Sequence, residues 1–490
     1  MAKIIHAPEI DRPGLTWLNV SQPLSLATLA GKLVILDFWT FCCINCMHVI
    51  PILRRVEDAY PDDVVVIGVH SPKFTAERDV ANVVPAIARY GITHPVIHDP
   101  DFILWKQFGV RAWPTLTFIS PDGYVIGQVS GEPDPRKLLE VVAQTLAENR
   151  AAGSLRPSPL VLNEVQPEES GRLRFPGKIK PLAAPRHGAV WAVADSGHHQ
   201  IVLLDAEGNE TRRFGSGRAG LVDGDGVAAQ FHAPQGLDSD ATALYVADTG
   251  NHALRRIDLG DGSVTTLAGT GRRGRPLGAA RDAGETALAS PWDIAVHDGH
   301  LFFANAGTHQ LGQLDLARGS VAALAGSGRE AIGDGAALDA SLAQPSGLAL
   351  AADGRILYFV DSETSAVRRL DLARGMVRTL VGRGLFDYGH VDGAFPDARL
   401  QHPLGLALTD DDTLVVADSY NNALRRLDLR RETVTDLDDG LLCRDALCLP
   451  LAEPAGIAAD GRGRLLVSDT NNHRIVLYDL TTRSTRTWFR

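Results

Sequence analysis

The sequence predicts an α/β domain followed by an all-β propeller of six blades. Two observations support this fold class. Apolar runs of strand length alternate with segments of helical spacing in residues 1–150, and one motif then recurs six times in residues 176–490. Residues 151–175 contain three prolines and no periodicity, so we expect a linker there.

The order of elements in residues 1–150 predicts helices packed on a sheet. The expected elements are strand 33–38, helix 49–60, strand 64–69, helix 76–90, strand 115–119, strand 124–129 and helix 138–149. A Pro-Asp-Gly turn at 121–123 joins the last two strands as a hairpin. Strand–helix–strand followed by a hairpin and a closing helix is an α/β arrangement.

The repeat predicts short strands without helical periodicity. Its anchors lie 51 to 57 residues apart, at Asp195, Asp248, Asn305, Asp361, Asp418 and Asp469. A Pro-x-Gly or Pro-x-Asp element precedes each copy after the first, as at 234–236 and 291–293. A four-stranded unit cannot bury both faces alone, so six copies should stack and close into a ring. The repeat resembles the NHL family, most clearly at 248–254 and 469–475.

Charge and hydropathy exclude several classes of partner. The formal net charge of -11 lacks the cationic excess that nucleic-acid binding requires. No apolar run reaches the roughly 20 residues that cross a bilayer, so we expect no membrane contact. The N-terminus has no apolar signal segment, so a cytoplasmic location is expected. Structural disulfides are rare there, and the cluster Cys42, Cys43 and Cys46 therefore indicates chemistry.

Cys43 and Cys46 form a Cys-x-x-Cys motif where the first strand gives way to a helix. Unpaired N–H groups and the positive end of the helix dipole stabilise a thiolate at Cys43. A spacing of three residues places Cys46 on the same helical face, where it can attack a mixed disulfide on Cys43. The motif therefore predicts a redox-active dithiol.

The surroundings of these cysteines resemble the thioredoxin superfamily, including its TlpA-like and redoxin branch. The resemblance covers Asp37-Phe38-Trp39 before the motif, Pro51 in the helix and Trp113-Pro114-Thr115. It implies that Asp37 accepts the proton of Cys46, and that Trp113 and a cis-Pro114 position the substrate chain. Cys42 stands where the family has Trp, which adds a third thiol able to compete for Cys46.

A Cys-Cys-Ile-Asn-Cys segment at 42–46 joined to an NHL propeller resembles the NHL repeat-containing protein 2 family. The resemblance implies a thiol–disulfide oxidoreductase whose substrate is a protein disulfide. The propeller would dock the substrate or another protein partner. We expect no cofactor and no metal.

Three other hypotheses remain. The chain could be a scaffold with a vestigial thioredoxin domain. It could be a thiol peroxidase, using Thr40-x-x-Cys43 and Arg111, although Leu36 stands where that family has proline. Zinc binding by the three cysteines and His48 lacks a second ligand pair, and Met47 excludes haem attachment.

Several features of residues 176–490 also need interpretation. Cys443 and Cys448 could be a second dithiol that takes electrons from Cys43 and Cys46, but a reduced pair in a surface hairpin is expected in the cytosol. The loop at Asp223 resembles a calcium loop but has Val227 where an oxygen ligand is required, so it is expected to be a turn. Arginine pairs at 255/256, 368/369 and 425/426 predict ion pairs between blades.

Overall fold

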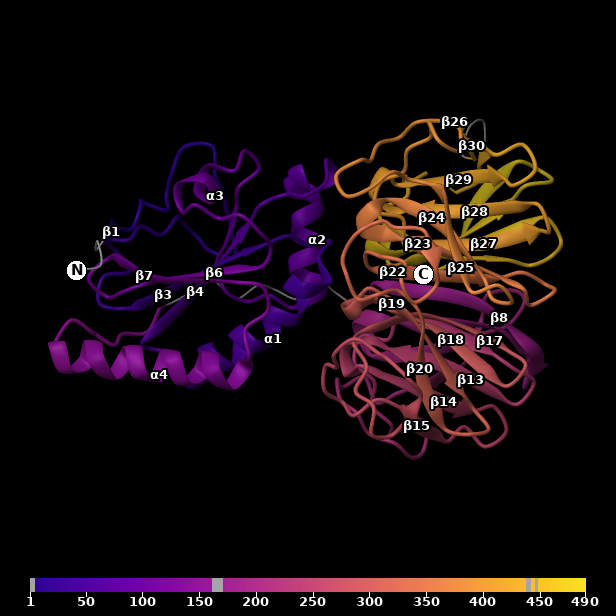
Figure 1. Cartoon of the computed structure of the whole chain (residues 1–490), viewed down its shortest axis with the longest axis horizontal. Coiled ribbons are helices and arrows are strands. Elements are labelled where there is room, and N and C mark those ends of the chain that lie inside the picture. The colour runs from indigo at the N-terminus through magenta and orange to yellow at the C-terminus, as the bar shows by residue number, and fades with distance from the viewer. Residues whose placement is uncertain (1–4, 161–170, 438–441, 446–447) are drawn as a thin grey trace. The chain divides into compact units, whose positions relative to one another are not determined.

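The structure is a computed structural model that describes residues 5–160, 171–437, 442–445 and 448–490 (Figure 1). The chain divides into two compact units, Met1–Glu168 and Glu169–Arg490. The expected 151–175 linker lies partly outside the described residues. No helix within the described ranges is long and apolar enough to cross a bilayer.

The first unit is a seven-stranded sheet covered by helices, in the strand order β1-β7-β6-β3-β4-β5-β2. Its elements are β1 (Ile5–His6), β2 (Thr16–Leu18), β3 (Leu33–Trp39), α1 (Ile44–Ala59), β4 (Val64–His70), α2 (Val80–Tyr90), β5 (Val96–His98), α3 (Ile103–Gln107), β6 (Thr115–Ile119), β7 (Tyr124–Ser130) and α4 (Pro135–Ala152). Strands β3, β4 and β5 are parallel, whereas β6 and β7 form the predicted hairpin.

Both faces of this sheet are buried, as the apolar runs predict. Leu33 and Ile35 point to the face covered by α1 and α4, whereas Val34 and Leu36 point to the opposite apolar cluster. Every residue of β3 is buried, and the strand lies at the centre of the sheet. Its carboxyl end leads directly into the cysteines.

Three predicted helices begin at other residues than expected: α1 at Ile44, α2 at Val80 and α4 at Pro135. Helix α1 begins at Ile44, before the apolar spacing that starts at Val49, so the Cys-x-x-Cys segment forms its first turn. Residues 76–78 form a separate 3-10 turn, and α2 begins after Asp79, whose side chain accepts the Ala81 N–H at 2.9 Å.

The second unit is the predicted six-bladed propeller, and each blade comes from one continuous stretch of chain. The main strands are β8 (Pro176–Arg186), β9 (Ala189–Asp195), β10 (Gln200–Leu204) and β11 (Glu210–Phe214) in blade 1; β12 (Gly236–Ser239), β13 (Ala243–Asp248), β14 (Ala253–Asp258) and β15 (Val264–Ala268) in blade 2; β17 (Pro291–His297), β18 (His300–Asn305), β19 (Gln310–Asp315) and β20 (Ser320–Ala325) in blade 3; β22 (Pro345–Leu350), β23 (Ile356–Asp361), β24 (Ala366–Asp371) and β25 (Met376–Val381) in blade 4; β27 (Gly405–Asp410), β28 (Thr413–Asp418), β29 (Ala423–Asp428) and β30 (Thr433–Asp436) in blade 5; and β32 (Pro454–Ala459), β33 (Arg464–Asp469), β34 (Arg474–Asp479) and β35 (Ser484–Phe489) in blade 6.

Short additional strands extend four of the blades at their outer edges. They are β16 (Arg281–Asp282), β21 (Gly335–Ala336), β26 (Gly393–Ala394) and β31 (Leu442–Cys443). The first strand of every blade packs against the first strands of its two neighbours, so β8, β12, β17, β22, β27 and β32 surround a central channel. These innermost strands carry the Pro-x-Gly elements.

The recurring motif hydrogen-bonds each blade to the next. After the anchor residue comes Ser or Thr in five of the six copies, and its hydroxyl donates to the proline carbonyl of the following blade, as Thr249 does to Pro291 at 2.6 Å. Four residues after the anchor, a side chain on left-handed backbone accepts a backbone N–H of the following blade, as His252 Nδ1 accepts from Ser290 at 3.0 Å. The six acceptors are His199, His252, His309, Ser365, Asn422 and His473.

The same pair of bonds closes the ring between the last blade and the first. His473 Nδ1 accepts the Phe175 N–H at 3.0 Å, and the Thr470 hydroxyl donates to the Pro176 carbonyl at 2.8 Å. An apolar cluster that includes Trp191 and Trp488 fills the space between these two blades. Closure therefore uses side-chain packing and the motif itself.

The first arginine of each predicted pair forms an ion pair within its own blade, so the prediction of blade-to-blade pairs is wrong. Arg255 is fully buried and binds Asp248 of its own motif and Asp223 of the preceding loop, both at 2.8 Å. Arg368 and Arg425 do the same in their blades. Asp223 also accepts the Thr266 N–H and hydroxyl, so its loop is a turn held by side-chain bonds.

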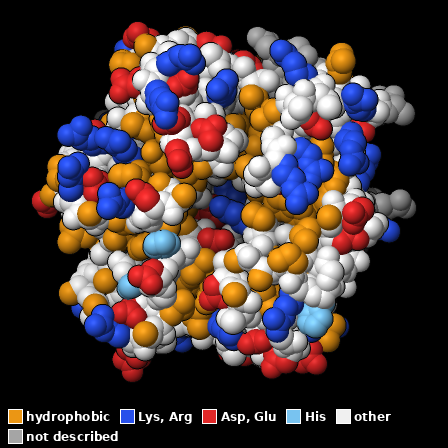
Figure 2. All heavy atoms as spheres, turned by 90° about the vertical axis from the view of Figure 1, so that its right-hand side faces the viewer, with side chains coloured by type: hydrophobic (Ala, Val, Ile, Leu, Met, Phe, Trp, Pro, Cys, Tyr) orange, Lys and Arg blue, Asp and Glu red, His pale blue; other side chains and the backbone are white. Residues whose placement is uncertain are grey.

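The central channel contains charged side chains from two of the innermost strands, and Figure 2 shows basic and acidic atoms in the hollow at the centre of one propeller face. Lys178 and Asp293 occupy a position that is glycine in the other four blades. Lys178 Nζ donates to the carbonyls of Leu404 and Ala455, the latter at 2.8 Å. Burial lowers the pKa of Lys178 to about 8.

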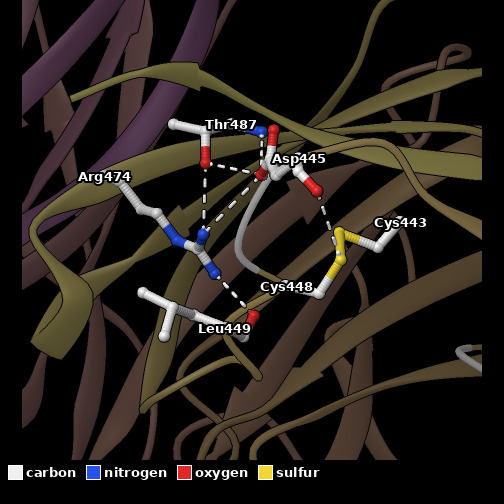
Figure 3. The surroundings of a disulfide bond; sticks show 6 residues. All are labelled: Cys443, Asp445, Cys448, Leu449, Arg474 and Thr487. Atoms are coloured by element: carbon white, nitrogen blue, oxygen red, sulfur yellow. Dashed lines mark hydrogen bonds and ion pairs between the residues drawn. A yellow bond between two sulfur atoms is a disulfide. The ribbon is translucent and has the colours of Figure 1, made fainter.

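Cys443 and Cys448 form a disulfide, which contradicts the expected reduced pair (Figure 3). The expectation rested on cellular location, whereas the fold brings the two Cα atoms to 6.0 Å, within bridging range. Between the cysteines, Asp445 accepts the N–H and hydroxyl of Thr487, each at 2.8 Å.

Candidate functional site

Cys43 is the N-cap residue of α1, immediately after the turn that follows β3. The N–H groups of Cys46 and Met47 donate to the Cys43 carbonyl at 3.1 and 3.2 Å, which begins the helix. The Cys43 side chain makes no cap hydrogen bond to the helix. Its thiol therefore lies at the N-terminal end of α1, next to the first N–H groups of the helix.

Cys46 lies one turn further along α1 and differs from Cys43 in its surroundings. Both thiols are reduced and buried. Burial raises the pKa of the Cys46 thiol well above its usual value, and the hydrogen bond with Cys43 and the negative charges of Cys43 and Asp37 raise it further. Cys46 thus keeps its proton until a base removes it, which suits a resolving thiol.

Asp37 is a buried carboxyl group in β3. Asp37 is 1% exposed, and its Oδ1 atom has no hydrogen-bond partner among the residues that the structure describes. Burial raises the pKa of Asp37 to about 7, so the group exchanges protons readily near neutral pH. The negative charge of ionised Asp37 also raises the pKa of Cys46. The geometry is therefore compatible with the predicted role of proton acceptor.

Trp113 and Pro114 lie at the edge of the sheet where β3 ends. Their peptide bond is cis, and β6 begins at the next residue, Thr115, which pairs with Phe38 of β3. Trp113 Nε1 donates to the Ser71 carbonyl at 2.9 Å, and its ring lies 4.3 Å from that of Trp105. The register of β3 and β6 thus places Trp113 and Pro114 next to the turn that carries the cysteines.

Glu77, a fully buried carboxylate behind this turn, is a further residue of the site that the sequence pattern does not predict. Its Oε1 accepts the Thr40 hydroxyl at 2.6 Å and the Cys42 N–H at 3.0 Å. Helical spacing of apolar residues predicts a helix over 76–90, but it does not predict that Glu77 points into the core. A buried Glu is uncommon unless it is paired or hydrogen-bonded.

A histidine pair beneath the same turn was also missed. The Nδ1 atoms of His70 and His98 are 3.2 Å apart, and His98 Nε2 lies 3.0 Å from the Arg78 carbonyl. Burial lowers the pKa of both rings, which favours their neutral forms. With a proton on His98 Nε2 for that carbonyl, a neutral His98 accepts at Nδ1 and His70 donates through its own Nδ1. Burial lowers the pKa of His70 well below its usual value. The His70 ring stacks on Phe41 with centroids 5.3 Å apart.

The alternative sites receive less support from the geometry. The Thr40 hydroxyl is bound to Glu77 and Arg111 is exposed, so neither is arranged as the peroxidase hypothesis requires. His48 Nδ1 lies 3.0 Å from Glu132. Among the described residues, His48 and the three cysteines do not converge on one point as metal ligands would.

Comparison with known proteins identifies the same two parts. A thioredoxin-like family model matches residues 31–125, and an NHL repeat model matches residues 400–427 and 451–478. Thiol-disulfide oxidoreductase ResA of Halalkalibacterium halodurans is 25% identical over 108 residues, which cover 21% of this chain and 57% of that protein.

Two relatives match nearly the whole chain. Protein SUPPRESSOR OF QUENCHING 1, chloroplastic, of Arabidopsis thaliana is 39% identical over 487 residues, which cover 95% of this chain. This chain spans only 46% of that relative's length. NHL repeat-containing protein 2 of Bos taurus is 36% identical over 509 residues, which cover 96% of this chain and 70% of the bovine protein. Identity at this level over more than two thirds of the bovine protein shows that the chain belongs to the NHL repeat-containing protein 2 family.

Proposed function

We propose that the chain is a thiol–disulfide oxidoreductase that acts on protein disulfides through Cys43 and Cys46. The Cys43 thiolate attacks a substrate disulfide, forms a mixed disulfide and releases one substrate thiolate. Asp37 then accepts the Cys46 proton, and Cys46 attacks the Cys43 sulfur. The second substrate thiol leaves, and Cys43 and Cys46 become a disulfide. The substrate is reduced by two electrons, and the reverse sequence oxidises it.

The observation that supports this proposal most strongly is the buried Asp37 carboxyl behind Cys46. A carboxyl with a pKa of about 7 is matched to proton transfer at neutral pH, whereas a purely structural position would favour an apolar residue. The similarity to a protein named thiol-disulfide oxidoreductase agrees with this chemistry. Trp113 and the cis-Pro114 are proposed to align the substrate chain beside the dithiol, with Cys42 as an accessory thiol.

Trapping tests the proposal directly. The Cys46→Ser variant keeps a Cys43 thiol that can attack a substrate disulfide, but it lacks the thiol that releases the substrate. Mixed disulfides should therefore accumulate on Cys43. The measurement is the recovery of reduction-sensitive adducts by non-reducing electrophoresis and mass spectrometry. The control is Cys43→Ser with Cys46→Ser, which should trap nothing. An absence of adducts on Cys43, together with no reversible dithiol–disulfide couple in the wild type, would rule out the enzyme.

The propeller is proposed to dock the protein substrate or a partner, and the cytoplasm is the proposed location. The double cysteine variant separates docking from chemistry, because it should retain partner binding in a pull-down while losing turnover. Deletion of the dithiol with no loss of cellular function would instead favour the scaffold hypothesis. Fractionation of cells that produce the full chain tests the location.

A further inference from the structure

We propose that Glu77 is a positioning residue for the dithiol, an inference that rests on the proposed oxidoreductase function. Its carboxylate holds the Thr40–Cys42 turn from behind and thereby fixes Cys43 at the start of α1. It also places a fixed negative charge beneath the site. Glu77 touches neither of the reacting sulfurs in this role.

The geometry joins two loops through one side chain. Oε1 accepts the Thr40 hydroxyl at 2.6 Å and the Cys42 N–H at 3.0 Å, from the turn after β3. Oε2 accepts the N–H groups of Lys73 and Phe74 at 2.7 and 2.9 Å, from the loop after β4. Because β3 and β4 are parallel neighbours, these loops leave the same edge of the sheet. Glu77 thus ties the cysteine turn to the next loop along that edge.

The four partners also determine which form of the side chain fits. Three are backbone N–H groups, which can only donate, and the hydroxyl of Thr40 completes the set. An ionised carboxylate accepts all four bonds. A carboxamide would direct its NH₂ group at one or two backbone N–H groups, whichever way it turned. Burial raises the pKa of Glu77, while the bonds from Thr40, Phe74, Lys73 and Cys42 oppose that shift.

Fixing the Cys42 amide constrains the residue that precedes the helix N-cap. The direction of the Cys43 side chain relative to the first helical N–H groups depends on this backbone. Displacements of about 1 Å in a reacting group can reduce rates by about 100-fold. The structure therefore assigns Glu77 a share in the reactivity of Cys43 without contact with the substrate.

The experiment uses the full chain and 5,5′-dithiobis(2-nitrobenzoate) as the disulfide probe. Attack by Cys43 releases the first thionitrobenzoate, and attack by Cys46 on the mixed disulfide releases the second, so the two phases report the two steps separately. All variants carry Cys42→Ala, which retains the Cys42 N–H and removes the competing thiol. The control is Glu57→Gln, which alters a glutamate of α1 that lies 3.3 Å from His94.

Glu77→Gln is expected to slow the first phase by about 10- to 100-fold. The pH at which this phase is half-maximal should also move down, because removal of a nearby negative charge favours a thiolate. A merely structural glutamate would lower the melting temperature but leave that pH unchanged. Thr40→Val removes one of the four bonds and should slow the first phase by a smaller factor.

The outcomes separate the two proposals. If the wild type shows no two-phase reaction, the oxidoreductase proposal fails whatever Glu77 does. If the wild type reacts in two phases and Glu77→Gln reacts at the same rate with the same pH dependence, only the positioning role is overturned. If Glu77→Gln does not fold, an unchanged rate and pH dependence in Thr40→Val overturns it.

Discussion

Asp37 is a carboxyl group in the central strand of the first unit, away from the water that would stabilise its charge. Its pKa of about 7 lies above the value of 3.8 that it has in an unfolded chain. The native state therefore binds more protons than the unfolded state between these values, and stability falls as the pH rises from about 4 through 7. The folded protein is less stable for having this base beside Cys46.

Asp37→Asn should consequently lower the rate of the redox reaction and raise the stability of the fold. We expect the second phase of the thionitrobenzoate reaction to slow by about 10- to 100-fold at neutral pH, because Cys46 loses its proton acceptor. The first phase should change little. Denaturant unfolding at pH 8 should show the variant to be more stable by up to about 4 kcal/mol, a gain that disappears near pH 4.

Asp58→Asn, an exposed change on α1, is the matched control and should alter neither quantity. A second phase of unchanged rate in Asp37→Asn would remove Asp37 from the mechanism.

Residues of the site differ in how far the sequence could predict them. Cys43, Cys46 and Asp37 lie in one short segment whose spacing carries chemical meaning on a helix and a strand. Glu77 reaches the Cys42 amide across 35 positions, and His70 reaches His98 across 28. Such contacts depend on which loops leave the same edge of a sheet. Local sequence periodicity therefore does not predict them.

The repeated motif shows at the level of an element why different side chains can occupy one position. The residue on left-handed backbone must supply a hydrogen-bond acceptor to the next blade. His, Asn and Ser all do so, as Asn422 accepts from Glu453 at 2.8 Å and Ser365 from His402 at 3.2 Å. The copy at 361, which departs from the family pattern, therefore keeps the bond. The strand pattern was predictable, whereas this shared function needed the neighbouring blade.

His199→Asn tests this view through pH. Burial, with the neighbouring His232 and Arg174, lowers the pKa of His199 to about 4. The neutral ring has an unprotonated Nδ1 atom that accepts the Ala233 N–H. Between pH 6.5 and 4 the unfolded chain binds the extra proton, so this contribution to stability is lost as the pH falls. The melting temperature of the asparagine variant should therefore fall by a few degrees less than that of the wild type over this range.

His199→Leu, which offers no acceptor, should melt below both proteins at pH 7. Equal melting temperatures for the leucine and asparagine variants at that pH would contradict the assigned hydrogen bond.

At the scale of the whole propeller, six similar blades close into a ring without sharing a strand. Lys178 connects the first blade to the last two by hydrogen bonds. Its ammonium group donates to carbonyls in blades 5 and 6, while Asp293 accepts the Leu348 N–H of blade 4 at 2.9 Å. The six-fold repeat predicted the ring. The lysine and aspartate in positions otherwise occupied by glycine were visible in the sequence, but their meaning depends on strands that meet only around the channel.

Lys178→Met should lower the stability of the propeller by about 2 kcal/mol or more at pH 7, because it leaves two buried carbonyls without donors. Lys180→Met is the control, since Lys180 Nζ has a single carbonyl contact at 3.3 Å and is less buried. Differential scanning calorimetry of the full chain measures both. A smaller loss for Lys178 than for Lys180 would show that the channel lysine does not support closure.

This lysine also bears on the order of events during synthesis. Its two carbonyl partners lie 226 and 277 residues further along the chain, so the first blade leaves the ribosome with an ammonium group that has no permanent ligand. A ring that closed early, with four blades, would leave the Lys178 ammonium group in the channel without those two carbonyls. The growing polypeptide is thereby discouraged from completing a smaller circle before its final blades exist.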